Sequence, residues 1–150
     1  MKKSAWVVAK ALLLCAAFAF LPGRLMHAQA EEPIYVCGDF LAELGKKPKH
    51  LNYERCEYHA DEQLKPLVAR YSVSGRDAAG VEASLAKSFG LKKLRFECCG
   101  WSAREVWFKD KKGREYMLHM ASEETLANTR AKWSEIPVFH VWIELVTEEP

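Results

Sequence analysis

The cysteines are the residues of this sequence with the most evident chemistry. Four follow residue 30, and their even number predicts disulfides if the chain is exported to an oxidising compartment: Cys37, Cys56, Cys98 and Cys99. We favour two bonds that run from the adjacent pair to Cys37 and Cys56, because a bond between neighbouring residues distorts the peptide between them. The alternative pairing joins Cys37 to Cys56 and Cys98 to Cys99.

A structural role is the prediction for these thiols. Each bond would add about 2–4 kcal/mol to the free energy of unfolding by restricting the unfolded chain. A redox or metal site at Cys98-Cys99 is the alternative, but the sequence contains no Cys-x-x-Cys, which is the spacing of thiol oxidoreductases and zinc ribbons. We therefore expect neither a metal nor a cofactor.

The remaining reactive residue types form no catalytic motif. Four histidines follow residue 30, and none stands in His-Glu-x-x-His or His-x-His: His50, His59, His119 and His140. No nucleophile elbow or phosphate-binding loop occurs. A carboxylate pair such as Glu97 and Glu144 would have to meet across a sheet to act together. We assign no catalytic residue and favour a protein that is not an enzyme.

Aromatic side chains are the most prominent candidates for binding, because they bury a large area at low entropic cost. Trp101 follows the Cys98-Cys99-Gly100 break, and Trp133 precedes the last predicted strand, so we expect both indoles to be exposed anchors. Trp142 is either covered by another element, which we favour, or exposed beside His140. The candidate binding residues are Trp101, Trp133, Trp142 and His140.

The elements that must position these residues are short strands and a few helices. Period-2 and period-3.6 patterns predict strands at 51–58, 67–73, 91–99, 105–109 and 114–120, and a last strand that Pro137 opens. Helices are predicted at 37–44 and 78–89, with a short helix or ordered loop at 123–132. Short connections favour a mainly antiparallel sheet with two or three short helices on one face. The fold class is α+β, a single disulfide-stapled domain.

Alternation in the last strand separates two sets of side chains. Phe139, Val141, Ile143 and Leu145 form an apolar face for the core, and His140, Trp142 and Glu144 lie opposite. The same alternation places Val68, Arg70 and Ser72 on the second side of the strand at 67–73.

The first 30 residues have the parts of a secretory signal peptide. Lys2 and Lys3 form a basic start, residues 11–22 are a 12-residue apolar stretch, and Ala28-Gln29-Ala30 is a small-x-small cleavage site. The apolar stretch is shorter than the roughly 20 residues of a spanning helix. We expect cleavage after Ala30, no stable membrane anchor, and one domain over 31–150 that is periplasmic or secreted.

Cleavage reverses the sign of the net charge. Loss of Lys2, Lys3, Lys10 and Arg24 from 22 basic residues leaves 18 against 20 acidic residues, so the net charge changes from +2 to −2. Proteins that bind nucleic acid present clustered positive charge. The one dense basic cluster, at 46–50, is interpreted as a solvated loop. We therefore expect no nucleic-acid partner.

Three phrases resemble a family of small exported bacterial proteins that is known only as a domain of unknown function. They are ELGKKPKHL (43–51), FECCGW (96–101) and KWSEIP (132–137). The resemblance implies one exported domain and brings no catalytic residue with it.

These observations favour a non-enzymatic exported protein that binds another protein of the envelope or the medium, such as an inhibitor or immunity protein. One alternative is a hydrolase of envelope polymer, which would require His119, His140 and Glu144 to converge in a pocket. The other is a redox-active protein that uses Cys98-Cys99.

Overall fold

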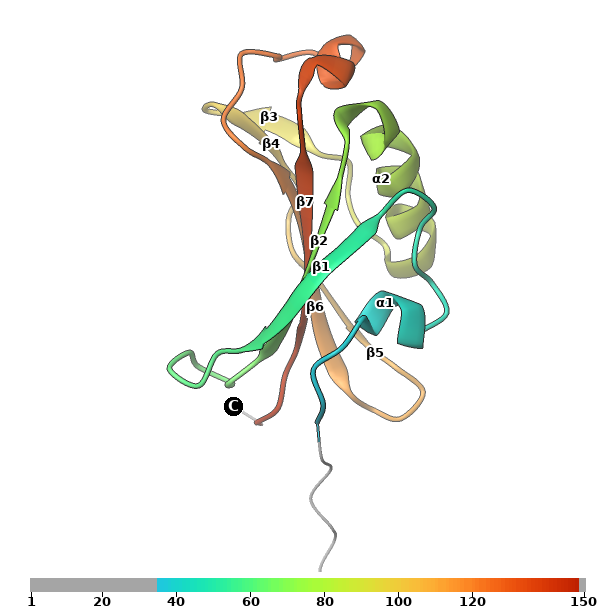
Figure 1. The fold of residues 1–150 in the computed structure, drawn as a ribbon, viewed down its shortest axis with the longest axis vertical. Coiled ribbons are helices and arrows are strands. Elements are labelled where there is room, and N and C mark those ends of the chain that lie inside the picture. Colours follow the sequence, from blue (N-terminus) through green and yellow to red (C-terminus); the bar gives the residue numbers. More distant parts are fainter. Residues whose placement is uncertain (1–34, 149–150) are drawn as a thin grey trace, which may run out of the picture. The chain divides into compact units, whose positions relative to one another are not determined.

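A seven-stranded antiparallel sheet organises residues 35–148, the part of the chain that this computed structural model describes (Figure 1). The strands are β1 (Asn52–Tyr58), β2 (Leu67–Val73), β3 (Arg95–Glu97), β4 (Gly100–Ser102), β5 (Val106–Lys109), β6 (Glu115–Ser122) and β7 (Phe139–Leu145). Their order is β1-β2-β7-β6-β4-β3, and β5 also pairs with β6. The predicted α+β class, with an antiparallel sheet and a disulfide, is confirmed.

β7 lies in the interior of the sheet, with a hydrogen-bonded neighbour on each edge and one buried face. It is antiparallel to β2 along Leu67–Val73 and to β6 along Tyr116–Ser122. Its odd-numbered residues are buried and its even-numbered residues are partly exposed, which is the alternation that the sequence predicts.

The long helix α2 (Gly75–Phe89) lies against one side of the sheet (Figure 1). Ala78, Val81 and Leu85 on its inner face are buried in the core. The helix begins three residues before the predicted start, at Gly75, which closely approaches the backbone of the 3-10 helix η1 (Arg130–Glu135). A Cβ atom at Gly75 would lie 1.8 Å from the Trp133 carbonyl oxygen, so a larger residue cannot occupy this position.

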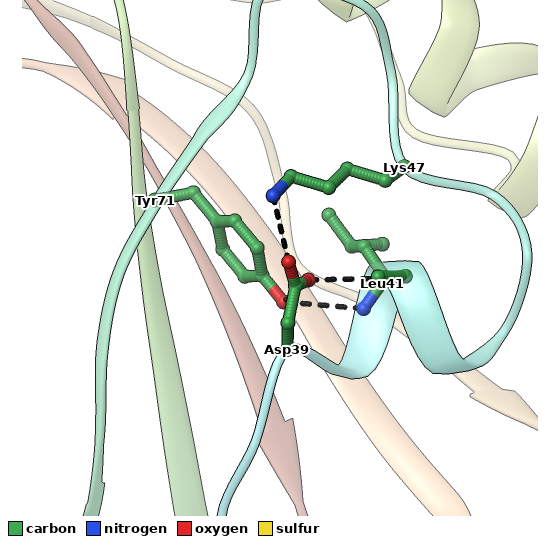
Figure 2. A network of polar contacts seen from close by, with 5 residues as sticks. Asp39, Leu41, Lys47 and Tyr71 are labelled. Carbon is green, nitrogen blue, oxygen red and sulfur yellow. Dashed lines mark hydrogen bonds and ion pairs between the residues drawn. The ribbon is translucent and has the colours of Figure 1, made fainter.

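The first helix, α1 (Phe40–Glu43), is a single turn held by a polar network (Figure 2). The Tyr71 hydroxyl of β2 donates to Asp39 Oδ1 at 3.0 Å and accepts from the Leu41 amide at 3.1 Å. Lys47 Nζ donates to Asp39 Oδ2 at 2.6 Å. Burial alone would raise the pKa of Asp39, but its bonds with Lys47, Ala42 and Tyr71 lower it below its usual value.

Two further predicted elements differ from the structure. Only Arg95–Glu97 of the expected strand at 91–99 is extended, because Cys98 and Cys99 form the turn of a tight hairpin between β3 and β4. Cys98 has a left-handed φ of 57°, and its side chain is exposed. The short helix or ordered loop expected at 123–132 is a 3-10 helix at 130–135.

The predicted signal peptide and its cleavage site lie outside the described residues. Residues 35–148 belong to one compact unit, Pro33–Pro150. No helix within the described part has the length and apolar character needed to cross a bilayer.

Candidate functional site

The side of the sheet away from α2 carries polar and aromatic residues in cross-strand rows. We call this side the open face, and define it by the outward positions of β2, β7 and β6: Val68, Arg70, Ser72, His140, Trp142, Glu144, Met117, His119 and Ala121. Two rows matter most. One aligns Arg70, Trp142 and His119, and the next aligns Val68, Glu144 and Met117.

Trp142 is the centre of the first row. Its indole stacks on the His119 ring, with centroids 5.3 Å apart and planes 19° apart, and lies 5.7 Å from the His140 ring. The predicted grouping of Trp142 with His140 and Glu144 on one face is confirmed, and the indole is partly exposed rather than covered. A partly exposed indole held between imidazoles is a rigid platform for an apolar or cationic group.

An open hollow of about 360 Å³ lies over these rows, and we call it the acidic hollow. Its walls are strand residues, together with Glu105 from the β4–β5 connection and two residues of the β1–β2 loop: His59, Glu62, Val68, Arg70, Glu105, Met117, His119, Trp142 and Glu144. Three carboxylates therefore face one guanidinium and two imidazoles. His59 is already engaged, since its Nδ1 lies 2.6 Å from Glu62 Oε1.

The pKa values of Glu144 and His119 in the acidic hollow are shifted from their ordinary values. Burial raises the pKa of Glu144, and the nearby Glu62 and Glu105 carboxylates raise it further. Burial lowers the pKa of His119, although Glu105 and a backbone hydrogen bond at Ala103 partly oppose this. Ionisation of either side chain is thus more costly here than in water.

Arg70 adds an unsatisfied donor to the same site. Its Nε atom is buried and has no hydrogen-bond partner within the described residues. Glu57 Oε2 lies 3.4 Å away, close enough for an ion pair but without hydrogen-bond geometry. A buried donor of this kind is stabilised when a ligand or partner supplies an acceptor.

The histidines and Glu144 share one face without forming a catalytic triad-like array. No hydrogen bond joins His119, His140 and Glu144 in the part of the chain that the structure covers, and the hydrogen-bond partner of His140 is Glu123, at 3.3 Å. What the geometry offers is an aromatic platform rimmed by carboxylates.

Two of the four predicted binding residues are not on this face. Trp101 and Trp133 are 6% and 3% exposed, so the expectation that they are exposed anchors is wrong. Trp101 Nε1 donates to the Ala127 carbonyl oxygen at 2.7 Å, and the two indoles meet edge-to-face at 5.2 Å. The break at Cys98-Cys99-Gly100 is a hairpin turn that directs Trp101 into the core.

An ion pair between the buried Glu82 and the partly exposed Arg130 lies beside these indoles, and it was not found from the sequence. Arg130 of η1 donates to both carboxylate oxygens of Glu82 in α2, at 2.8 and 2.5 Å, and its guanidinium lies 4.3 Å from the Trp133 ring centre. Glu82 also accepts from the Leu94 amide at 2.7 Å. The residues are 48 positions apart, and a Glu at an inner position of the predicted helix was the available signal.

The favoured disulfide pairing is wrong. Cys37 and Cys56 are bonded to each other, and Cys98 and Cys99 are free thiols. The sheet order explains this, because Cys56 lies on β1 at one edge and the β3–β4 turn lies at the other. The alternative pairing is therefore correct for Cys37 and Cys56.

Cys98 and Cys99 form an exposed pair of thiols. Their Sγ atoms are 3.0 Å apart, and Cys99 Sγ lies 3.8 Å from Glu124 Oε1. The hydrogen bond with Cys98 and the negative charge of Glu124 raise the pKa of Cys99 to about 11. The reactive cysteines of thiol–disulfide exchange enzymes have a lowered pKa, whereas the pKa of Cys99 is raised. No cluster of three or more His, Cys, Asp or Glu residues in the described segment is arranged for a metal ion.

Comparison with known families adds an assignment to this geometry. Residues 26–101, just over half of the chain, match the family described as domain of unknown function DUF4952. The chain belongs to the DUF4952 family. The match covers β1, β2, α2, β3 and the start of β4, so the acidic hollow draws on residues inside and beyond it. No curated protein and no solved structure matches the chain.

The resemblance seen in the sequence is therefore confirmed at the level of the family. The Cys37–Cys56 bond fits an oxidising compartment outside the cytoplasm, where disulfides persist.

Proposed function

We propose that this protein is an exported, periplasmic or secreted binding protein, and that the open face holds another protein through the acidic hollow. Its occupant is a basic side chain of that protein, placed over Trp142 and between the carboxylates. Inhibitors and immunity proteins act by such occlusion of a partner, and a rigid sheet loses little entropy on docking.

The observation that carries the proposal is that Glu62, Glu105 and Glu144 line one hollow together with the partly exposed Trp142 indole. Burial and the Glu62 and Glu105 carboxylates raise the pKa of Glu144, against the opposing charges of His59 and Arg70, and a further cation would stabilise the ionised carboxylate. An Arg or Lys over an indole gains a further cation–π attraction.

A titration with N-acetylarginine amide tests the site without knowledge of the partner. We expect saturable shifts of the Trp142 indole signal in NMR spectra, and an affinity weakened about tenfold in Glu144→Gln. Leu126→Ala is the matched control, because Leu126 is 97% exposed and outside the hollow. Absence of shifts, or equal binding by Glu144→Gln, would contradict the proposed occupant.

Capture from an envelope extract tests the larger claim. A partner retained by the wild type and by Leu126→Ala, but lost with Trp142→Ala, supports binding through the open face. A partner retained equally by all three proteins, or no partner under conditions that keep weak complexes, would count against it.

A hydrolase of envelope polymer is the second candidate, favoured by one observation. Glu144, with its raised pKa, and Glu105 share the hollow, as an acid and a base of a glycosidase would. Release of reducing ends from peptidoglycan by the wild type but not by Glu144→Gln would establish this function. No release by either protein would reject it.

A further inference from the structure

A second and larger hollow, of about 660 Å³, has the opposite charge, and we call it the basic hollow. Lys92 and Lys93 come from the segment that follows α2, Arg95 from β3, and Arg104 from the connection after β4. Ser102 lies opposite Arg95 in the β3–β4 register. Glu97 is the single acidic residue among those that line the hollow.

The cations of the basic hollow differ from most other arginines of the protein. Arg55, Arg70, Arg114 and Arg130 each have a carboxylate oxygen within 4.0 Å. None of the four cations here takes part in an ion pair within residues 35–148, and neither does Glu97. Four cations that line one concavity give it a positive potential, which attracts an anion.

The types of side chain indicate which anion fits. Two guanidinium groups offer planar forks that match phosphate oxygens, two ammonium groups add point charges, and the Ser102 hydroxyl can donate one more hydrogen bond. The volume suits a small ligand or a headgroup. A carboxylate could also accept hydrogen bonds from the two guanidinium groups, but a single carboxylate group could not contact all four cations.

We propose that the basic hollow is a binding site for a phosphate-bearing anion, either a free phosphate compound or the headgroup of an anionic lipid. The proposal does not depend on the open face, because no residue lines both hollows. A variant can therefore lose phosphate binding in the basic hollow and keep partner binding on the open face, or the reverse.

Inorganic pyrophosphate is the first probe, measured by calorimetry at low salt. We expect saturable binding that weakens as salt is added, and a loss of about tenfold or more in Arg95→Gln/Arg104→Gln. Lys111→Gln/Lys112→Gln removes the same charge from the exposed β5–β6 turn and should bind like the wild type. If the arginine variant does not fold, as judged by circular dichroism, Lys92→Gln/Lys93→Gln replaces it.

Vesicles distinguish the two sources of phosphate. Binding to phosphatidylglycerol vesicles but not to phosphatidylcholine vesicles, lost in the arginine variant, assigns a lipid headgroup. Pyrophosphate binding without vesicle binding assigns a soluble phosphate compound. No binding to either probe, or an equal loss in the Lys111→Gln/Lys112→Gln control, would overturn the site.

The thiol pair carries an independent second inference. The sulfurs of Cys98 and Cys99 are in contact at 3.0 Å on an exposed turn, and the Thr125 amide donates to the Cys99 carbonyl oxygen at 2.7 Å. We infer that these neighbours become a disulfide when the protein meets a disulfide-bearing oxidant. The oxidant's S–S bond breaks to give two thiols, which take the two hydrogens, and one S–S bond forms between Cys98 and Cys99.

Mass spectrometry of protein exported by its own cell tests this step. We expect two alkylatable thiols to appear only after reduction of the Cys98-Cys99 peptide, with the peptide two hydrogens lighter beforehand. Cys98→Ser should leave Cys99 open to alkylation without reductant. Two thiols that react freely in the native protein would overturn the inference.

Discussion

Each side of the sheet carries an arginine next to a tryptophan, but the two arginines differ in their hydrogen-bond partners. On the helix side, Arg130 lies against Trp133 and donates to both oxygens of Glu82. On the open face, Arg70 lies beside Trp142 in the register, with a buried Nε that has no hydrogen-bond partner in the described chain. The first arrangement closes a core. The second leaves polar groups ready for a partner, which is what distinguishes a site from a scaffold.

The largest expected difference is between the two indoles. Trp133→Ala should lower the free energy of unfolding by about 3–5 kcal/mol, because it empties a volume between Trp101, Phe139 and Arg130. Trp142→Ala should cost about 1 kcal/mol, since its indole is partly exposed. Urea unfolding measures both. Equal losses would mean that Trp142 is a core residue and that the two sides do not differ as described.

The two arginines give the next contrast. Arg130→Ala should cost about 2 kcal/mol, because it leaves the Glu82 carboxylate buried, and the partial exposure of Arg130 reduces the effect. Arg70→Ala should change stability by about 0.5 kcal/mol or less. A large loss with Arg70→Ala, measured in the same way, would show that Arg70 is structural.

Tyr71 and Ser72, which are neighbours in β2, compare the buried side and the open face within one strand. Tyr71→Phe should cost about 1–2 kcal/mol, since the hydroxyl joins the Leu41 amide to Asp39 (Figure 2). Ser72→Ala, on the open face, should be close to neutral. If Tyr71→Phe were neutral in thermal unfolding, the network that holds α1 would contribute nothing to stability.

The smallest effect has the opposite sign. A raised pKa means that folded Glu144 binds its proton more tightly than in the unfolded chain, so stability falls as pH rises from the ordinary pKa to the raised one. Glu144→Gln should therefore gain about 0.5 kcal/mol or less at neutral pH and nothing in acid below the ordinary pKa. Unfolding curves at both pH values check this. A variant that is less stable at neutral pH would reverse the assigned electrostatics.

The sequence predicted the sheet better than the site. Alternation in β7 and β2 placed Trp142, His140, Glu144 and Arg70 on one side, because a side-chain period of two is a local property of a strand. It could not show that Glu105 and the loop residue Glu62 reach the same hollow. Those contacts depend on how the β1–β2 loop and the β4–β5 connection lie over the sheet.

The errors share one cause. Cys56 and the Cys98-Cys99 turn were expected to be close, but strand order places them at opposite edges. Trp101 and Trp133 were expected to be exposed because each lies beside a predicted break, yet the hairpin turn and η1 direct both inward. The position of a residue next to a turn in the sequence does not determine whether its side chain faces the core or the solvent.

Taken alone, the sequence determined the α+β class, the buried and outward sets of the last strand, and the expectation of a disulfide among the four cysteines of the domain. Periodicity and composition act over a few residues, so they are legible without a structure. Only the tertiary structure decided which cysteines bond, which tryptophans are exposed, and where unpaired charges collect, because these depend on strand order and on segments far apart in the sequence, such as β2 and β7.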